Sequence, residues 1–189
     1  MQAFHRFQLS TAAIRRLLLP VPTKLKNYLL ITLVIVFSIG LDQFTKNLAR
    51  EHLKYSGTVS IVGDVFVLVY AENDGAFLGM GSNIPQPYKT VVLTIFPVLL
   101  TLFALGYLIL EKNLTLGEMI CIASVIGGGM SNLYDRILHQ GTVTDFMNFG
   151  IGPWLRTGIL NTADLSITLG AVALVWLQMY RNKKDPKSI

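Results

Sequence analysis

Aspartates in apolar sequence are the first feature of this chain that could carry chemistry. Asp145 and Asp164 each lie in a largely uncharged segment with no Lys or Arg within four residues. A carboxylate in such surroundings is costly to ionise unless it finds a partner elsewhere in the fold. Two apposed aspartates cannot both ionise easily, because desolvation and mutual repulsion raise one pKa. A pair that shares a proton can hydrolyse a peptide, since one member activates water while the other polarises the carbonyl.

Other acidic residues have a cation close by. Asp42 and Lys46 are spaced i, i+4, which places them on one helical face, and Asp135 is followed directly by Arg136. We therefore expect Asp42 to pair with Lys46, and Asp135 to pair with Arg136 or another cation. The sequence still leaves Asp135 open as a catalytic acid in place of Asp145.

Other catalytic sets are weaker. No His-Glu-x-x-His spacing joins the histidines, so we expect no zinc, other metal or cofactor; they are His5, His52 and His139. An ion- or proton-coupled carrier is an alternative to a protease, because intramembrane carboxylates mark either class. A carrier favours polar groups near the middle of the membrane and repeated halves, and the sequence indicates neither.

The elements that must position these residues are membrane helices. The chain has 189 residues, of which 52% are apolar and only 14% charged. A helix that crosses the hydrocarbon needs about 20 mainly apolar residues. Four stretches satisfy this, at residues 27–49, 88–110, 116–138 and 159–180. Pro97 interrupts the second stretch, and Gly127, Gly128 and Gly129 in the third predict close helix packing.

Basic residues predict the orientation of these helices, because Lys and Arg concentrate on the cytoplasmic side. Most of them precede the first stretch, follow the fourth, or lie between the second and third: Arg6, Arg15, Arg16, Lys24, Lys26, Lys112, Arg181, Lys183, Lys184 and Lys187. Both termini are therefore expected in the cytoplasm. The predicted organisation is a basic segment at 1–26, a single four-helix domain at 27–182 and a tail at 183–189. The net charge of +5 is not arranged as a nucleic-acid-binding face.

The connection between the first two helices predicts β-structure. Residues 58–62 and 65–70 are rich in β-branched and aromatic side chains, and Gly63-Asp64 separates them. The expected fold is an all-α integral membrane protein with four transmembrane helices and a small extracytoplasmic β-hairpin or sheet at the membrane surface. This topology brings the polar helix ends to the extracytoplasmic face.

Five short motifs resemble those of the lipoprotein signal peptidase (signal peptidase II) family. Asp42-Gln43-Phe44-Thr45-Lys46 resembles its D-x-x-T-K motif, and Asn73-Asp74-Gly75-Ala76 is similar to its N-x-G-A box. The remaining three follow in the family order: Asn132-Leu133-Tyr134-Asp135-Arg136 resembles N-x-x-D-R, Val143-Thr144-Asp145-Phe146 resembles V-x-D-F, and Asn161-Thr162-Ala163-Asp164 matches N-x-A-D. Ser131 replaces a glycine of the family pattern.

The resemblance implies a bacterial inner-membrane aspartic endopeptidase. Its substrates would be prolipoproteins carrying diacylglycerol on a cysteine, cut on the N-terminal side of that cysteine. Membrane lipids would surround it, and globomycin-like peptides would inhibit it. Asp145 and Asp164 would form the catalytic dyad. Residues expected to bind substrate or support the site are Asp42, Lys46, Asn73, Gly75, Asn132, Asp135, Arg136 and Asn161.

Overall fold

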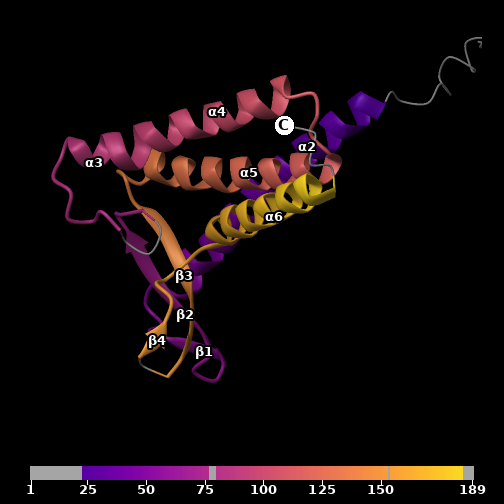
Figure 1. Cartoon of the computed structure of the whole chain (residues 1–189). Helices are drawn as coiled ribbons and strands as arrows, with labels where there is room; N and C mark the ends of the chain where they lie inside the picture. The colour runs from indigo at the N-terminus through magenta and orange to yellow at the C-terminus, as the bar shows by residue number, and fades with distance from the viewer. Residues whose placement is uncertain (1–22, 77–79, 153, 185–189) are drawn as a thin grey trace, which may run out of the picture.

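The predicted four-helix membrane architecture is confirmed in a computed structural model, which describes residues 23–76, 80–152 and 154–184. Four helices are long and apolar enough to cross a membrane: α2 (Thr23–His52), the helix Tyr88–Leu110, α5 (Leu116–Leu138) and α6 (Thr162–Lys184) (Figure 1). The first helix begins before the expected residue 27. Most of the basic N-terminal segment, at 1–22, and most of the tail, at 185–189, lie outside the described residues.

Helix α5 packs against α2, α6 and α4 (Phe96–Leu110), and its glycines make close approach possible. A Cβ on Gly127 would lie 2.7 Å from the Ser38 Cβ on α2, and one on Gly128 would lie 2.6 Å from the Ala163 carbonyl oxygen on α6. Successive helical residues turn by about 100°, so neighbouring glycines face different helices. The predicted role of these glycines in close packing is confirmed for Gly127 and Gly128.

The second membrane helix is continuous but irregular. It consists of α3 (Tyr88–Thr90), a π-helical turn η2 (Val91–Ile95) and α4 (Phe96–Leu110). Pro97 lacks an N–H, and its ring conflicts with the carbonyl four residues earlier in a regular helix. The predicted interruption takes the form of a π-helical turn that ends at Ile95, two residues before Pro97.

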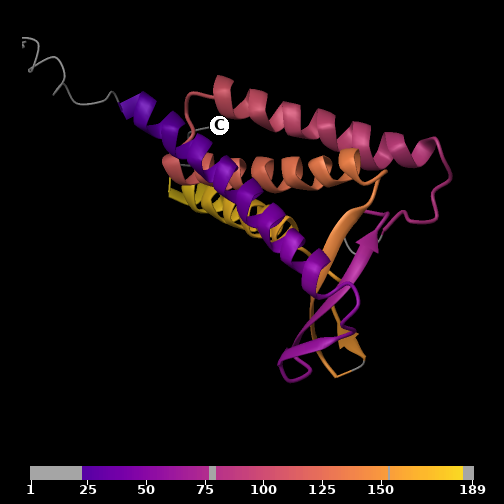
Figure 2. The same ribbon diagram turned by 180° about the vertical axis from the view of Figure 1, so that it is seen from behind.

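An antiparallel sheet projects from one end of the helices (Figures 1 and 2). Its order is β1 (Val59–Val62), β2 (Phe66–Asn73), β3 (Val143–Ile151) and β4 (Leu155–Arg156). The predicted hairpin is β1–β2. The segment around Asp145, expected only as a connection, is strand β3, and Asp145 pairs with Ala71 of β2.

The sheet is joined to the helices by its own apolar cluster. Phe146 and Met147 of β3 pack with Ala49 of α2 and with Leu160, the residue before the Asn161 that caps α6. The backbone of β3 also bonds to Leu160, whose carbonyl accepts from the Phe146 and Met147 N–H groups at 2.9 and 2.8 Å. These contacts fix β3 against the ends of α2 and α6.

Gly128→Ala is expected to lower the stability of the protein by about 1–3 kcal/mol, because the new methyl would lie 2.6 Å from the Ala163 carbonyl oxygen and 2.8 Å from the Ile167 Cγ1. Gly106→Ala on α4 is the matched control, since its Cβ would meet nothing within 4 Å. Thermal unfolding in detergent would measure both. Equal melting temperatures for the two variants would contradict the packing role.

Candidate active site

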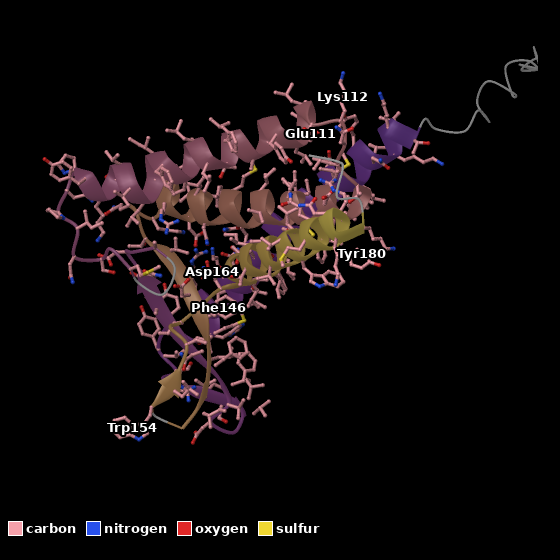
Figure 3. All side chains as sticks on the ribbon, viewed as in Figure 1. Glu111, Lys112, Phe146, Trp154, Asp164 and Tyr180 are labelled. Atoms are coloured by element: carbon pink, nitrogen blue, oxygen red, sulfur yellow. The ribbon has the colours of Figure 1, made fainter. Side chains whose placement is uncertain are left out.

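The polar side chains of the bundle gather at the end that carries the sheet. They come from the C-terminal ends of α2 and α5, the N-terminal end of α6 and strand β3. Figure 3 shows Asp164 and Phe146 at this end, whereas Glu111, Lys112 and Tyr180 lie at the other. The prediction that the polar ends of the helices converge is therefore confirmed.

A buried ion-pair network links α2 to α5. The Lys46 side chain is fully buried, and its Nζ lies 2.6 Å from the Asp42 Oδ2 and 3.2 Å from the Asp135 Oδ2. It also donates to the Asn132 Oδ1 at 2.8 Å, which engages all three of its N–H donors. Arg50 supplies a second cation, with its Nη2 3.1 Å from the Asp135 Oδ1. Two cations therefore balance two carboxylates.

Further hydrogen bonds fix these carboxylates. The Ser131 Oγ donates to the Asp42 Oδ2 at 2.8 Å, and the Thr144 N–H donates to the Asp135 Oδ2 at 3.1 Å. Gln43 donates both to the Ser131 Oγ and to the Asp135 Oδ1. Ser131, where the family pattern has glycine, is thus a fully buried member of the network.

The expected pairing of Asp42 with Lys46 is confirmed, whereas Asp135 pairs with Lys46 and Arg50 and not with Arg136. Residues adjacent in a helix point about 100° apart, so Arg136 faces another side of α5. Its Nη2 donates to the Gly75 carbonyl at 2.9 Å. Arg136 therefore ties α5 to the turn that follows β2.

That turn is shaped by Asn73. The Asn73 Oδ1 accepts from the Gly75 N–H at 2.9 Å, and its Nδ2 donates to the Ala76 carbonyl at 3.1 Å. The same Nδ2 donates to the Asp145 Oδ2 at 2.8 Å. Asn73 thus joins the turn to Asp145 across the β2–β3 pair.

Asp164 is held at the N-terminus of α6 by reciprocal capping. The Asn161 Oδ1 accepts from the Asp164 N–H at 2.9 Å, and the Asp164 Oδ2 accepts from the Asn161 N–H at 3.3 Å. This arrangement explains why α6 begins at Thr162 rather than at residue 159. The first turn of a helix also favours a negative charge.

Two amides bridge the aspartates. The Asn161 Nδ2 donates to the Asp145 Oδ1 at 2.6 Å and to the Asn132 Oδ1 at 3.2 Å. The Asn132 Nδ2 donates to the Asp164 Oδ1 at 3.0 Å. Since the Asn132 Oδ1 also accepts from Lys46, the amide bridge rests directly on the ion-pair network.

The environment of Asp145 favours its protonated form. Burial raises the pKa of the Asp145 carboxyl from 3.8 to about 6, with the negative charge of Asp164 acting in the same direction. Hydrogen bonds from Asn73 and Asn161 lower this pKa and so oppose the shift. Among the described residues, neither Asp145 nor Asp164 forms an ion pair.

The two aspartates line different cavities. Asp164 lies on an apolar cavity of about 450 Å³ between α4, α5 and α6. Other lining residues are Ala76, Pro97, Gly129, Asn132, Arg136, Ile167, Thr168, Ala171 and Val172. Asp145 lies on a smaller cavity of about 240 Å³ with Asn73, Asp74 and Ile159. Within the described part of the chain, no group of three or more His, Cys, Asp or Glu side chains is placed to hold a metal.

All ten site residues named from the sequence lie in this connected set of contacts. The sequence interpretation missed Gln43, Arg50, Ser131 and the Thr144 N–H. Arg50 follows Lys46 by four residues on the same helical face, and this spacing was a usable signal. No sequence pattern indicated a role for the Thr144 N–H, because that role depends on where β3 docks.

Lys46→Met is expected to destabilise the protein by about 3–5 kcal/mol, because it leaves two buried carboxylates short of a cation. Lys54→Met is the control: it removes a partly exposed pair with Glu72 and should lower stability only slightly. Unfolding in detergent would compare them. A loss for Lys46→Met no larger than that for Lys54→Met would refute the network's structural role.

Known proteins resemble this chain in sequence and in fold. The family model described as signal peptidase (SPase) II matches residues 34–180. The lipoprotein signal peptidase of Pelodictyon phaeoclathratiforme is 35% identical, with 81% of this chain and 90% of the relative covered. That of Caldanaerobacter subterraneus is 32% identical, with 78% and 94% covered. A bacterial membrane enzyme solved by the in meso method has the same fold, with a TM-score of 0.71 at 23% identity over 84% of this chain and 92% of that one. The chain therefore belongs to the signal peptidase II family, the membrane-embedded peptidases that remove signal peptides from prolipoproteins.

Proposed function

We propose that this protein is an aspartic endopeptidase in which Asp145 and Asp164 form the catalytic dyad. The observation that carries the proposal is the bridge from Asp145 through Asn161 and Asn132 to Asp164. No cation of the described residues forms an ion pair with either carboxylate. Because the chain belongs to a peptidase family, we prefer a peptidase to the ion- or proton-coupled carrier that the sequence also allowed.

The proposed mechanism needs one shared proton. The ionised carboxylate takes a proton from water, and the hydroxide formed attacks the scissile carbonyl carbon while the protonated carboxyl donates to its oxygen. The tetrahedral intermediate collapses as the C–N bond breaks, and the departing amine takes a proton from the dyad. The raised pKa of Asp145 supports a pair that keeps this proton at pH values well above the usual aspartate pKa of 3.8.

Asp135 is the less suitable second acid. Its two carboxylate oxygens already accept from Lys46, Arg50, Gln43 and the Thr144 N–H. Such pairing holds a carboxylate ionised and leaves it little freedom to exchange protons. We assign Asp135, with Asp42 and Lys46, to support of the dyad.

The substrate proposed is a prolipoprotein with diacylglycerol on its cysteine, cut on the N-terminal side of that cysteine. The apolar cavity beside Asp164 is a suitable place for part of the lipid-modified segment, because its walls are mainly apolar and lie within the helices. Arg136 and Asn132 are the polar groups in that wall and would orient the peptide. Asn73, Gly75 and Asn161 would hold the dyad and the adjoining turn. Globomycin-like peptides would compete for the same cavity.

The proposed location is the bacterial inner membrane, with both termini cytoplasmic and the dyad near the extracytoplasmic face. The basic residues in the last turn of α6 support this orientation, and the sheet lies at the opposite end of the helices. The lipid-modified cysteine of a secreted precursor would reach the dyad from that side.

Asp145→Asn and Asp164→Asn are each expected to lower cleavage of a diacylglyceryl-modified prolipoprotein by about 10²–10⁴-fold, because an amide neither accepts nor donates the transferred proton. The measurement is single-turnover cleavage in liposomes. Asp135→Asn is the comparison and should keep part of the activity. If Asp145→Asn cuts and Asp135→Asn does not, the dyad assignment is wrong.

The rate of cleavage should depend on pH as a bell. On the acid side the ionised carboxylate gains a proton, and on the alkaline side the pair loses its shared proton. Since the pKa of Asp145 is raised to about 6, the alkaline limb should begin well above the usual aspartate value of 3.8. Initial rates in liposomes across pH 4–9 would test this expectation, and a flat profile would contradict it.

A further inference from the structure

A polar trough adjoins Asp145 and shares no lining residue with the apolar cavity beside Asp164. It consists of two cavities of about 240 and 230 Å³ that share Asp74 in their walls. The first is lined by Asp145 and Asn73, and the second by Lys89 and Thr142. The trough therefore runs from the proposed dyad, past the turn after β2, to the start of the second membrane helix.

The trough carries one ion pair across its middle. The Lys89 Nζ donates to an Asp74 carboxylate oxygen and, at 3.0 Å, to the Ser82 carbonyl. The Asp74 side chain is 52% exposed and that of Lys89 is 15% exposed, so both charges can meet a ligand from water. The Lys89 hydrogen bond lowers the pKa of Asp74, which keeps this carboxylate ionised.

The two cavities flanking the dyad match the two chemically different parts of a lipoprotein precursor. The apolar side suits the lipid-bearing segment, while the polar side begins at Asp145 and ends between the first turns of the second membrane helix and the turn that follows α5. A mature lipoprotein chain is polar and continues beyond the lipidated cysteine into water. Its first residues need a path that starts at the scissile bond and leaves the bundle at the sheet end.

Resting on the proposed function, we infer that the polar trough binds the mature-chain residues that directly follow the lipidated cysteine, and that Asp74 and Lys89 set the charge preference there. The ion pair makes the trough nearly indifferent to charge, because each member cancels the field of the other. Removing either member exposes the remaining charge to the peptide. The two single variants must then shift the preference in opposite directions.

The test uses diacylglyceryl peptides that share one signal segment and differ in the residue two positions after the cysteine, which is Ser, Lys or Asp. The quantity is the ratio of kcat/KM for the Lys peptide to that for the Asp peptide. Lys89→Gln should raise this ratio about sevenfold and Asp74→Asn should lower it about sevenfold, because one charge about 7 Å away in water-like surroundings changes the kcat/KM of the Lys and Asp peptides about threefold each, in opposite directions. Both shifts should shrink in about 1 M salt.

Two controls make the result specific. Lys112→Gln removes the same charge at the opposite end of the molecule and should leave the ratio at the parent value (Figure 3). The double variant Asp74→Asn/Lys89→Gln removes the pair as a unit and should return the ratio to the parent value. Opposite shifts in the single variants with recovery in the double variant would establish the trough.

Other outcomes overturn the inference in distinguishable ways. Ratios that stay at the parent value, or move in the same direction in both single variants, while the Ser peptide is cut, would exclude the trough and leave the proposed function standing. A shift in Lys112→Gln as large as that in Lys89→Gln would attribute the effect to overall charge. A parent protein that leaves the Ser peptide intact, or an Asp145→Asn variant that cuts it, would contradict the proposed function itself.

Discussion

The fully buried ammonium of Lys46 is the constraint to which the other polar contacts are adapted. A charge removed from water must be matched within the protein, and Asp42 and Asp135 match it from two different helices. This requirement fixes the register of α2 against α5. The same register places Asn132, which takes the third Lys46 hydrogen bond, where its amide reaches Asp164. The ion-pair network and the amide bridge are therefore one structure.

Much of the helical fold could be predicted because apolar length is a strong signal. The third helix matches its predicted bounds, 116–138, and the second matches at 88–110. The start of the fourth was predicted too early, since Ile159 and Leu160 are apolar but belong to the chain that pairs with β3 before Asn161 caps α6. Strand β3 was missed for a related reason. Its pairing with β2 joins residues 70 or more positions apart, and no local pattern specifies such a partner.

It was easier to predict which residues belong to the candidate site than to predict which of them contact each other. Charged and amide residues in apolar sequence are conspicuous, so all ten residues named from the sequence lie within the connected set. Their partners depend on helix rotation and docking, as Asp135 shows: it lies next to Arg136 in sequence but contacts Lys46 and Arg50 in space. The contribution of Ser131 was equally hidden, because a hydroxyl in a glycine-rich stretch acquires its role only when Asp42 comes within 2.8 Å.

The two aspartates lie on different kinds of secondary structure: Asp164 on a membrane helix and Asp145 on a strand of the sheet. Helices can form as soon as apolar segments enter the bilayer, whereas β3 must first pair with β2 and dock on Ala49 and Leu160. On the proposed mechanism, a newly inserted chain without its sheet holds only half of the dyad. Such a chain would be inactive during its own insertion, and it would gain activity only once β3 has docked.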